Sequence, residues 1–272
     1  RTQRMGGHSF QQIVGYRNLD DLSAKLEKFS YRVTKDEALD LPDKIYTVRH
    51  VSLTDDQIKH YMSLKNAAIA LLDDGDLVSA PAVMTQLPRL QQVLCGHLMT
   101  DDGDLVEFKT RRIDALLETI EEMSGGVIIW SRFRYDIRNI EAALKKAYGD
   151  DSTVNYYGDT SDSDRELAIK RFQDRDARFF VGNPQTAGKG LTLNAASNVI
   201  YYANDFNLES RVQSEDRCHR IGQKNTVTYV DFVSKGTVDE HIVKTLRAKI
   251  DLSAKTLGEK ARQWLELSPL KE

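Results

Sequence analysis

Two arginines near residue 220 are the side chains of this sequence whose type and spacing best suit chemistry. In the run Gln213–Gln223, the residues Gln213, Arg217 and Arg220 follow one another at intervals of four and three. On a helix these intervals bring side chains to one face. A guanidinium group keeps its positive charge and binds phosphate oxygens through two parallel N–H groups. The pattern therefore predicts a site that grips a polyphosphate.

The segment before these arginines alternates helices with short apolar strands. The apolar run Val127–Trp130 follows a helical stripe and is typical of a buried strand. Capping boxes at Ser163–Glu166 and Thr237–Glu240 predict the starts of two helices. Repeated β-α units predict an α/β fold with one parallel sheet, helices on both faces and right-handed crossovers. The other predicted strands are Val154–Tyr157, Arg178–Val181, Val199–Tyr202 and Val227–Val233.

Loops at the carboxyl ends of these strands are where we expect chemistry, because ligands of open parallel sheets bind there. The first three strands lead into Ser131–Phe133, Gly158–Thr160 and Gly182–Gly190. The fourth leads into the segment Asp205–Gln223, which contains the two arginines. We therefore expect the arginines to project from the edge of the sheet that carries the other loops.

Two helices with acidic turns are predicted upstream. Thr54–Gln57 is a capping box, and a second helix is expected over Val83–Leu98. The residues Asp-Asp-Gly-Asp-Leu-Val occur after each helix, at 73–78 and 101–106. A calcium loop is excluded because the oxygen ligands do not alternate and no glutamate closes the set. The repeats are typical of acidic turns, with Leu77–Val78 and Leu105–Val106 expected to pair as a ribbon. The apolar positions of the first helix are Ile58, Tyr61, Met62, Ala68, Ile69 and Leu72.

The composition is that of a globular protein with a sizeable core. The 272 residues are 40% hydrophobic and carry a net charge of −3. No apolar run reaches the roughly 20 residues that span a membrane, and no signal pattern opens the chain, so we expect an intracellular protein, cytoplasmic or nuclear, with no membrane partner. Cys95 and Cys218 lack metal-ligand spacing and are expected to be free thiols, and no metal site is predicted. Because the net charge is negative, any contact with nucleic acid must come from local patches.

The run Gln213–Gln223 closely resembles motif VI of the Swi/Snf branch of superfamily 2 helicase-like ATPases. The match lies in the sequence pattern Asp-Arg-x-His-Arg-Ile-Gly-Gln, since strand-separating relatives keep a third arginine where Gln223 stands. The resemblance extends from about Tyr16 to Leu257. Other matching segments are Val127–Phe133 (motif IV), Gly158–Phe172 (the stretch after it), Thr186–Leu193 (motif V), Lys235–Glu240 (the start of a closing brace helix), and Arg32–Glu37 with Leu41–Lys44 (the linker between two lobes).

Three features set this chain apart from the main branch. Thr186–Thr192 stands where that branch has Ala-Gly-Gly-x-Gly-Leu-Asn, and it is closer to annealing-helicase-like and viral or bacterial members, which argues against chromatin remodelling. Phe206–Leu208 replaces Trp-Asn-Pro. The sequence contains no Gly-x-x-x-x-Gly-Lys-[Ser/Thr] phosphate loop and no Asp-Glu-x-His motif. It is therefore the C-terminal RecA-like lobe that the chain resembles, and we expect it to be a piece of a longer chain.

The resemblance implies half of a split ATP site in a DNA-dependent ATPase that acts on double-stranded DNA. The N-terminal RecA-like lobe of the same polypeptide would supply the Mg²⁺ ligands, so the isolated chain is expected to be monomeric and inactive. Arg217 and Arg220 are implied to be catalytic, as arginine fingers. The ATP-binding residues implied are Gln213, Asp216, Gly188 and Gly190. The DNA-binding residues implied are Arg132, Gly158, Thr160, Thr186 and Lys189.

The same interpretation divides the chain into four parts: the end of lobe one with the tether (1–53), a helical subdomain with acidic turns (54–107), the RecA-like lobe (108–235), and the brace helix with a tail (236–272).

Some alternatives stay open. Gly188 and Gly190 fit a helix-entry turn as well as close approach to a nucleotide ribose or a DNA phosphate, and His219 fits a structural role as well as one that orients motif VI. A non-catalytic module that binds a partner through the acidic region 73–106 is the other function considered, and the intact motif VI speaks against it. No Gly-x-Gly-x-x-Gly follows the first strand, which excludes a dinucleotide-dependent oxidoreductase.

Overall fold

The computed structural model describes residues 2–5, 8–11, 17–26, 28, 30, 33, 38–73, 79–187 and 190–257. The chain divides into two compact units. One comprises Arg1–Tyr31, Leu53–Thr110 and Leu252–Lys260, and the other Arg32–Ser52, Arg111–Asp251 and Ala261–Glu272. Gly188 and Lys189, predicted to bind ligand, lie outside the described residues.

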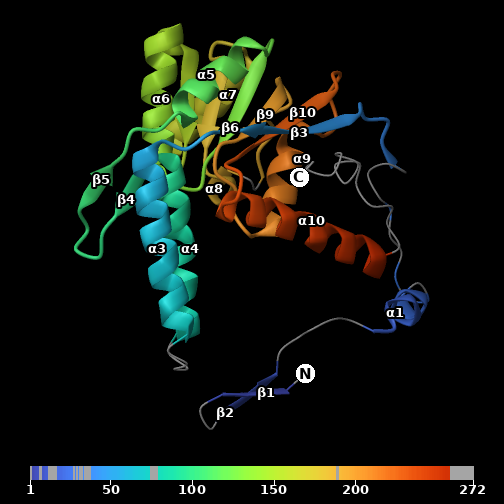
Figure 1. Cartoon of the computed structure of the whole chain (residues 1–272). Helices are drawn as coiled ribbons and strands as arrows, with labels where there is room; N and C mark the ends of the chain where they lie inside the picture. The colour runs from blue at the N-terminus through green and yellow to red at the C-terminus, as the bar shows by residue number, and fades with distance from the viewer. Residues whose placement is uncertain are drawn as a thin grey trace. The chain divides into compact units, whose positions relative to one another are not determined.

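The second unit is built on one six-stranded sheet in which every neighbouring pair of strands is parallel (Figure 1). The strand order is β3-β10-β9-β6-β8-β7. Residues Val127 to Trp130 of the central strand β6 are fully buried, as expected of a strand covered on both faces. The strands are β3 (Lys44–His50), β6 (Gly126–Trp130), β7 (Thr153–Tyr156), β8 (Phe179–Gly182), β9 (Ala196–Tyr201) and β10 (Val227–Val233).

The connections of this sheet place helices on both of its faces. From β6 the chain crosses β8 to reach β7, and it then returns in the opposite direction to β8, β9 and β10. Because parallel crossovers are right-handed, α6 covers one face while α7 and α9 cover the other. The predicted α/β fold is confirmed. The helices are α5 (Arg112–Glu121), α6 (Arg134–Tyr148), α7 (Asp162–Gln173), α8 (Pro184–Ala187), α9 (Leu208–Cys218) and α10 (Val238–Leu257), with a single 3₁₀ turn at Asp150–Ser152.

The edge strand β3 comes from the segment that the sequence assigned to the tether. It pairs in parallel with β10 along its whole length, from Lys44 opposite Val227 to His50 opposite Val233. The amide of Val51 extends the ladder by donating to the carbonyl of Val233. The tether is therefore part of the sheet that it leads into.

The predicted start of α7 was wrong by two residues. The side chain of Ser161, not Ser163, accepts the amide of Asp164 and caps the helix. Two serines stand two residues apart, and the backbone of Ser161 is extended, as a capping residue requires. Sequence alone does not separate these two candidates.

The first unit contains a pair of long helices and two hairpins. The predicted capping box is confirmed, since Gln57 donates its amide to Thr54 Oγ1 and Thr54 donates its amide to Gln57 Oε1. The predicted face of α3 is divided, because Tyr61 and Ala68 are buried while Ile58, Met62 and Ile69 are exposed. The elements are β1 (Thr2–Met5), β2 (His8–Gln11), α1 (Leu19–Leu26), α3 (Asp55–Asp73), α4 (Ser79–Cys95), β4 (His97–Met99) and β5 (Leu105–Glu107).

The predicted ribbon between the two acidic repeats stays a prediction, and the described partner of the second repeat is a nearby strand. The strand Leu105–Glu107 pairs with His97–Met99 in an antiparallel hairpin, because a partner a few residues away costs less loop entropy than a distant one. The residues Leu77 and Val78 lie outside the described part of the chain. Within the described part, no helix combines the length and the apolar character that crossing a bilayer requires.

A fully buried arginine, Arg112, holds the second unit together at the start of α5. Its Nε donates to the carbonyl of Tyr202 (2.9 Å), its Nη2 to the carbonyl of Phe232 (3.1 Å), and its Nη1 pairs with Asp239 Oδ2 (2.9 Å). These contacts join α5, β10, α10 and the loop after β9 through one side chain.

We predict that Arg112→Met destabilises the fold by about 3–5 kcal/mol, because the carboxylate of Asp239 stays buried without its counter-charge. The free energy of unfolding in urea measures this loss. Arg111→Met is the matched control, since Arg111 is exposed and precedes α5. Equal stability of the two variants would contradict the role given to Arg112.

Candidate functional site

Helix α9, which carries Arg217 and leads into Arg220, runs antiparallel to the strands. Near its start, Arg211 binds Asn204, which lies beyond the carboxyl end of β9. At its end, the thiol of Cys218 donates to the carbonyl of Ala196, the first residue of β9 (2.9 Å). Arg217 and Arg220 therefore lie toward the amino ends of the strands.

This position corrects the expectation that the arginines project from the carboxyl edge. A helix that links two parallel strands must return the chain to the amino ends before the next strand begins. The arginines stand in the last turn of α9 and just after it, and so they are carried to the opposite edge.

The two guanidinium groups converge on one backbone oxygen. The carbonyl of Leu191 accepts from Arg217 Nη1 (3.1 Å) and from Arg220 Nη1 (3.0 Å), while Arg217 Nε donates to the carbonyl of Gln213 (2.9 Å). Among the described residues, no carboxylate lies within ion-pair distance of either group. Burial lowers the pKa of Arg217, and the neighbouring charge of Arg220 lowers it further, against the opposing charge of Asp216.

Two positive charges held side by side in this way favour an anion. Arginine does not shed its proton in proteins, so the repulsion between the two groups is relieved by binding negative charge and not by titration. Several N–H groups of the pair remain beyond those that Leu191 and Gln213 accept. The donor set fits phosphate oxygens.

The other residues predicted to bind ATP lie beside this pair. Gln213 and Asp216 share α9 with Arg217, and Gln213 Nε2 donates to Glu209 Oε1 (2.7 Å). Gly190 precedes Leu191 and has a positive φ of 75°, a conformation that favours glycine, with open space where a side chain would stand. The loop therefore brings bare backbone to the residue on which both arginines converge.

The residues predicted to contact DNA lie at the carboxyl edge. Arg132 follows β6, Gly158 and Thr160 follow β7, and Thr186 lies in α8 after β8. The hydroxyl of Thr160 is engaged within its own loop, since it donates to Asn155 Oδ1 (2.9 Å) and accepts the amide of Tyr157 (3.1 Å).

Sequence analysis missed two further arginines at this edge. Arg134 and Arg138, in the first turns of α6, both pair with Asp159 (2.8 and 3.0 Å). Their side chains are 66% and 64% exposed, so one carboxylate steadies two cations that face solvent. A methyl group at Gly158 would come within 3.0 Å of Arg134 Nη2. Their spacing of four residues, one helical turn, was the available signal.

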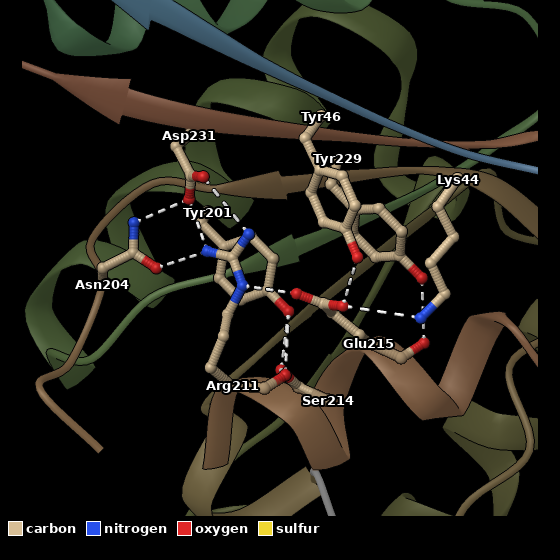
Figure 2. A network of polar contacts seen from close by, with 9 residues as sticks. All are labelled: Lys44, Tyr46, Tyr201, Asn204, Arg211, Ser214, Glu215, Tyr229 and Asp231. Atoms are coloured by element: carbon tan, nitrogen blue, oxygen red, sulfur yellow. Dashed lines mark hydrogen bonds and ion pairs between the residues drawn. The ribbon is translucent and has the colours of Figure 1, made fainter. Parts of the chain in front are cut away.

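Beneath α9 lies a buried polar network, which we call the α9 anchor (Figure 2). Its centre is Arg211, whose Nε donates to Glu215 Oε1 (2.9 Å) and whose Nη1 donates to Asn204 Oδ1 (2.7 Å) and also binds Asp231. Burial alone would lower the pKa of Arg211, but the negative charges of Asp231 and Glu215 raise it well above its ordinary value. The α9 anchor comprises Lys44, Tyr46, Tyr201, Asn204, Arg211, Ser214, Glu215, Tyr229 and Asp231.

Residues 109–222 match the family model for the helicase conserved C-terminal domain. The ATPase core of the SWI2/SNF2 protein from Sulfolobus solfataricus, solved in complex with double-stranded DNA, superposes with a TM-score of 0.63 at 26% identity, over 92% of this chain and 54% of that one. This chain carries a C-terminal helicase lobe of the Snf2 type. The resemblance stated from motif VI is thereby confirmed.

Sequence relatives of this Snf2-type lobe come from plants and bacteria. Protein CHROMATIN REMODELING 4 of Arabidopsis thaliana is 27% identical over 81% of this chain and 11% of its own length. The uncharacterized ATP-dependent helicase MG018 of Mycoplasma genitalium is 26% identical over 95% of this chain and 25% of its own length. The lobe thus spans a quarter or less of these two relatives. One relative is named a chromatin-remodeling protein and the other an ATP-dependent helicase, so the assignment of this chain to a distant branch of the family stays a prediction.

Both cysteines of this chain are buried thiols outside any disulfide, and Cys218 lies within the site. Burial raises the pKa of the Cys218 thiol from 9.0 to about 12, against the effect of its hydrogen bond with Gln223. The thiol is therefore predominantly protonated at neutral pH.

We predict that neither cysteine of the native chain reacts readily with a thiol reagent at pH 8, and that Cys218 still reacts slowly at pH 9, because thiolate is the reactive form and stays a minor fraction well below the raised pKa. Absorbance after adding 5,5′-dithiobis(2-nitrobenzoic acid) measures the rate. Unfolding in urea should release both thiols. Ser163→Cys, at an exposed position, is the positive control. Rapid labelling of Cys218 in the folded chain would refute the burial described here.

Proposed function

We propose that this chain is the half of an ATP-dependent double-stranded DNA translocase that supplies the arginine fingers. The observation that carries the proposal is the pair Arg217 and Arg220, held together on the carbonyl of Leu191 without a carboxylate partner among the described residues. Snf2-type membership supports ATP as the anion, since relatives are named ATP-dependent helicases.

The roles of this chain's residues at ATP follow from their chemistry. ATP, when bound, supplies the γ-phosphoryl group on which negative charge develops during transfer. Arg220 and Arg217 stabilise that charge, Gln213 and Asp216 hold the face of α9 that presents them, and Gly190, together with Gly188, allows close approach of backbone. The phosphate loop and the Mg²⁺ ligands are assigned to an N-terminal lobe, because this sequence contains neither motif.

Duplex DNA is the proposed second ligand, bound at the opposite edge of the sheet. Arg132, Arg134 and Arg138 gather there with Gly158, and the archaeal SWI2/SNF2 core was solved with double-stranded DNA. Thr186 and Lys189 complete the predicted set. Contacts of this kind bind phosphates and carry no sequence information.

We predict that Arg220→Ala, in the complete enzyme, lowers DNA-stimulated ATP hydrolysis by about 10³–10⁵-fold and leaves ATP binding within a few-fold. This loss corresponds to about 4–7 kcal/mol of transition-state stabilisation. Arg220→Lys should restore little, because an ammonium group lacks the planar fork. Steady-state turnover and equilibrium nucleotide binding separate the two effects, and Arg217→Ala should behave similarly.

The control for this experiment is Lys244→Ala on α10, where the side chain is 63% exposed. Arg247 lies on the same helix but is unsuitable as a control. Burial and the charge of Arg211 lower its pKa, so its guanidinium interacts electrostatically with the α9 anchor. If Arg220→Ala keeps more than about a tenth of the parental rate, less than about 1.4 kcal/mol is at stake and the assignment is wrong.

We predict that the isolated chain binds duplex DNA weakly, without sequence preference and with a steep dependence on salt. The slope of log affinity against log salt should fall by about 0.9 for each phosphate contact removed. Arg134→Ser combined with Arg138→Ser should therefore reduce the slope, whereas Lys146→Ser, exposed in the last turn of α6, should not. Fluorescence anisotropy at several salt concentrations measures it. An unchanged slope would remove α6 from the proposed interface.

A further inference from the structure

The tether segment contacts helix α9 and the residue that follows it at three points, and Figure 2 shows the two at Glu215. The carbonyl of Pro42 lies 2.7 Å from His219 Nε2. The hydroxyl of Tyr46 donates to Glu215 Oε2 (2.8 Å), and Lys44 Nζ lies 3.6 Å from the same oxygen. One carboxylate oxygen of α9 is therefore contacted by two side chains of strand β3.

Glu215 connects this tether to the end of the helix. Its other oxygen accepts from Arg211 Nε, so the carboxylate is held from two sides while only 1% of it is exposed. Its backbone carbonyl accepts the amide of His219 and the hydroxyl of Tyr229 (both 3.1 Å). A buried carboxylate with this many partners has one position, and the residues bonded to it share that position.

The arginine pair begins two residues after Glu215 and ends one residue after His219. The tether thus holds one residue just before the pair, Glu215, and one residue between its two members, His219. A displacement of about 1 Å at a catalytic group is enough to cost much of its rate effect. The geometry of β3 is therefore transmitted to Arg217 and Arg220 through hydrogen bonds and one ion pair.

We propose that Lys44 and Tyr46 are positioning residues for the arginine pair, acting through Glu215. The inference rests on the proposed function and names a further determinant of the same site. On this proposal, the segment that resembles the inter-lobe linker helps to position the two arginines.

The chain allows the hydrogen bond to be removed without disturbing the fold. The ring of Tyr46 stacks on that of Tyr229, with centroids 5.0 Å apart and an angle of 18° between planes. In Tyr46→Phe this stack and the backbone ladder to β10 persist, and only the hydroxyl is lost. Lys44→Met keeps the aliphatic stem and removes the charge, while Lys44→Arg restores it.

The test uses the complete enzyme. We expect Tyr46→Phe with Lys44→Met to lower kcat by about tenfold, equivalent to about 1.4 kcal/mol, with KM for ATP within about twofold. Lys44→Arg in place of Lys44→Met should recover most of the loss. In a background that already carries Arg217→Ala and Arg220→Ala, the two tether substitutions should cost nothing further, because coupled residues are not additive.

The matched controls are Tyr148→Phe and Lys146→Met, which alter the same residue types on α6. If the tether variant keeps its kcat while Arg220→Ala abolishes turnover, the proposed function stands and the positioning role is overturned. An equal tether effect with and without the arginines also overturns it, since the loss then has a general structural origin.

A second measurement on this chain alone does not depend on ATP hydrolysis. Hydrogen exchange of the His219 amide, which donates to the carbonyl of Glu215, should accelerate by about tenfold in Tyr46→Phe and not in Tyr148→Phe. Unchanged exchange would overturn the positioning role, whatever the turnover of Arg220→Ala. If Lys44→Met fails to fold, kcat and hydrogen exchange are both measured on Tyr46→Phe alone.

Discussion

The guanidinium group of Arg211 is the interaction on which the candidate site depends. It is almost entirely buried, and a buried charge is tolerated only where opposite charges and hydrogen bonds surround it. Asp231 on β10, Glu215 one turn along α9 and Asn204 after β9 meet that requirement, and the guanidinium lies 3.5 Å from the centroid of the Tyr201 ring. Satisfying one cation thus fixes a helix, two strands and a loop in one arrangement.

The sheet separates the two proposed ligands. Arg217 and Arg220 lie toward the amino ends of the strands, and the cluster around Asp159 lies at the carboxyl ends. At about 3.3 Å per residue, the six residues of β9 span roughly 20 Å between these edges. Strands that are buried on both faces link the two edges.

Local patterns in the sequence predicted much of this fold. The apolar run Val227–Val233 is β10 to the residue, and the capping box at Thr54 forms with both of its bonds. Each of these depends on neighbours within a few positions. The spacing of four and three residues, which singled out Gln213, Arg217 and Arg220, is helical for the first two, whereas Arg220 lies just beyond the end of α9.

What sequence could not supply depends on distant pairing. No local pattern distinguishes Arg211, which is buried, from the half-exposed Arg217 on the same helix, because the difference lies in Asp231 on another strand. Likewise, the segment of β3 was interpreted as part of the tether, because its pairing with the distant strand β10 cannot be read from local sequence. The edge at which the arginines stand was also mistaken, because it follows from the direction of α9 across the sheet.

The bond between Tyr46 and Glu215 joins residues that are 169 positions apart. A ribosome delivers the tether long before it delivers α9 and β10, so the edge position beside β10 cannot be filled until most of the chain has emerged. Pairings of such high sequence separation form slowly, and until then a nascent strand leaves its backbone groups open to other chains. The contact that we propose positions the arginines therefore forms late among the contacts of this lobe.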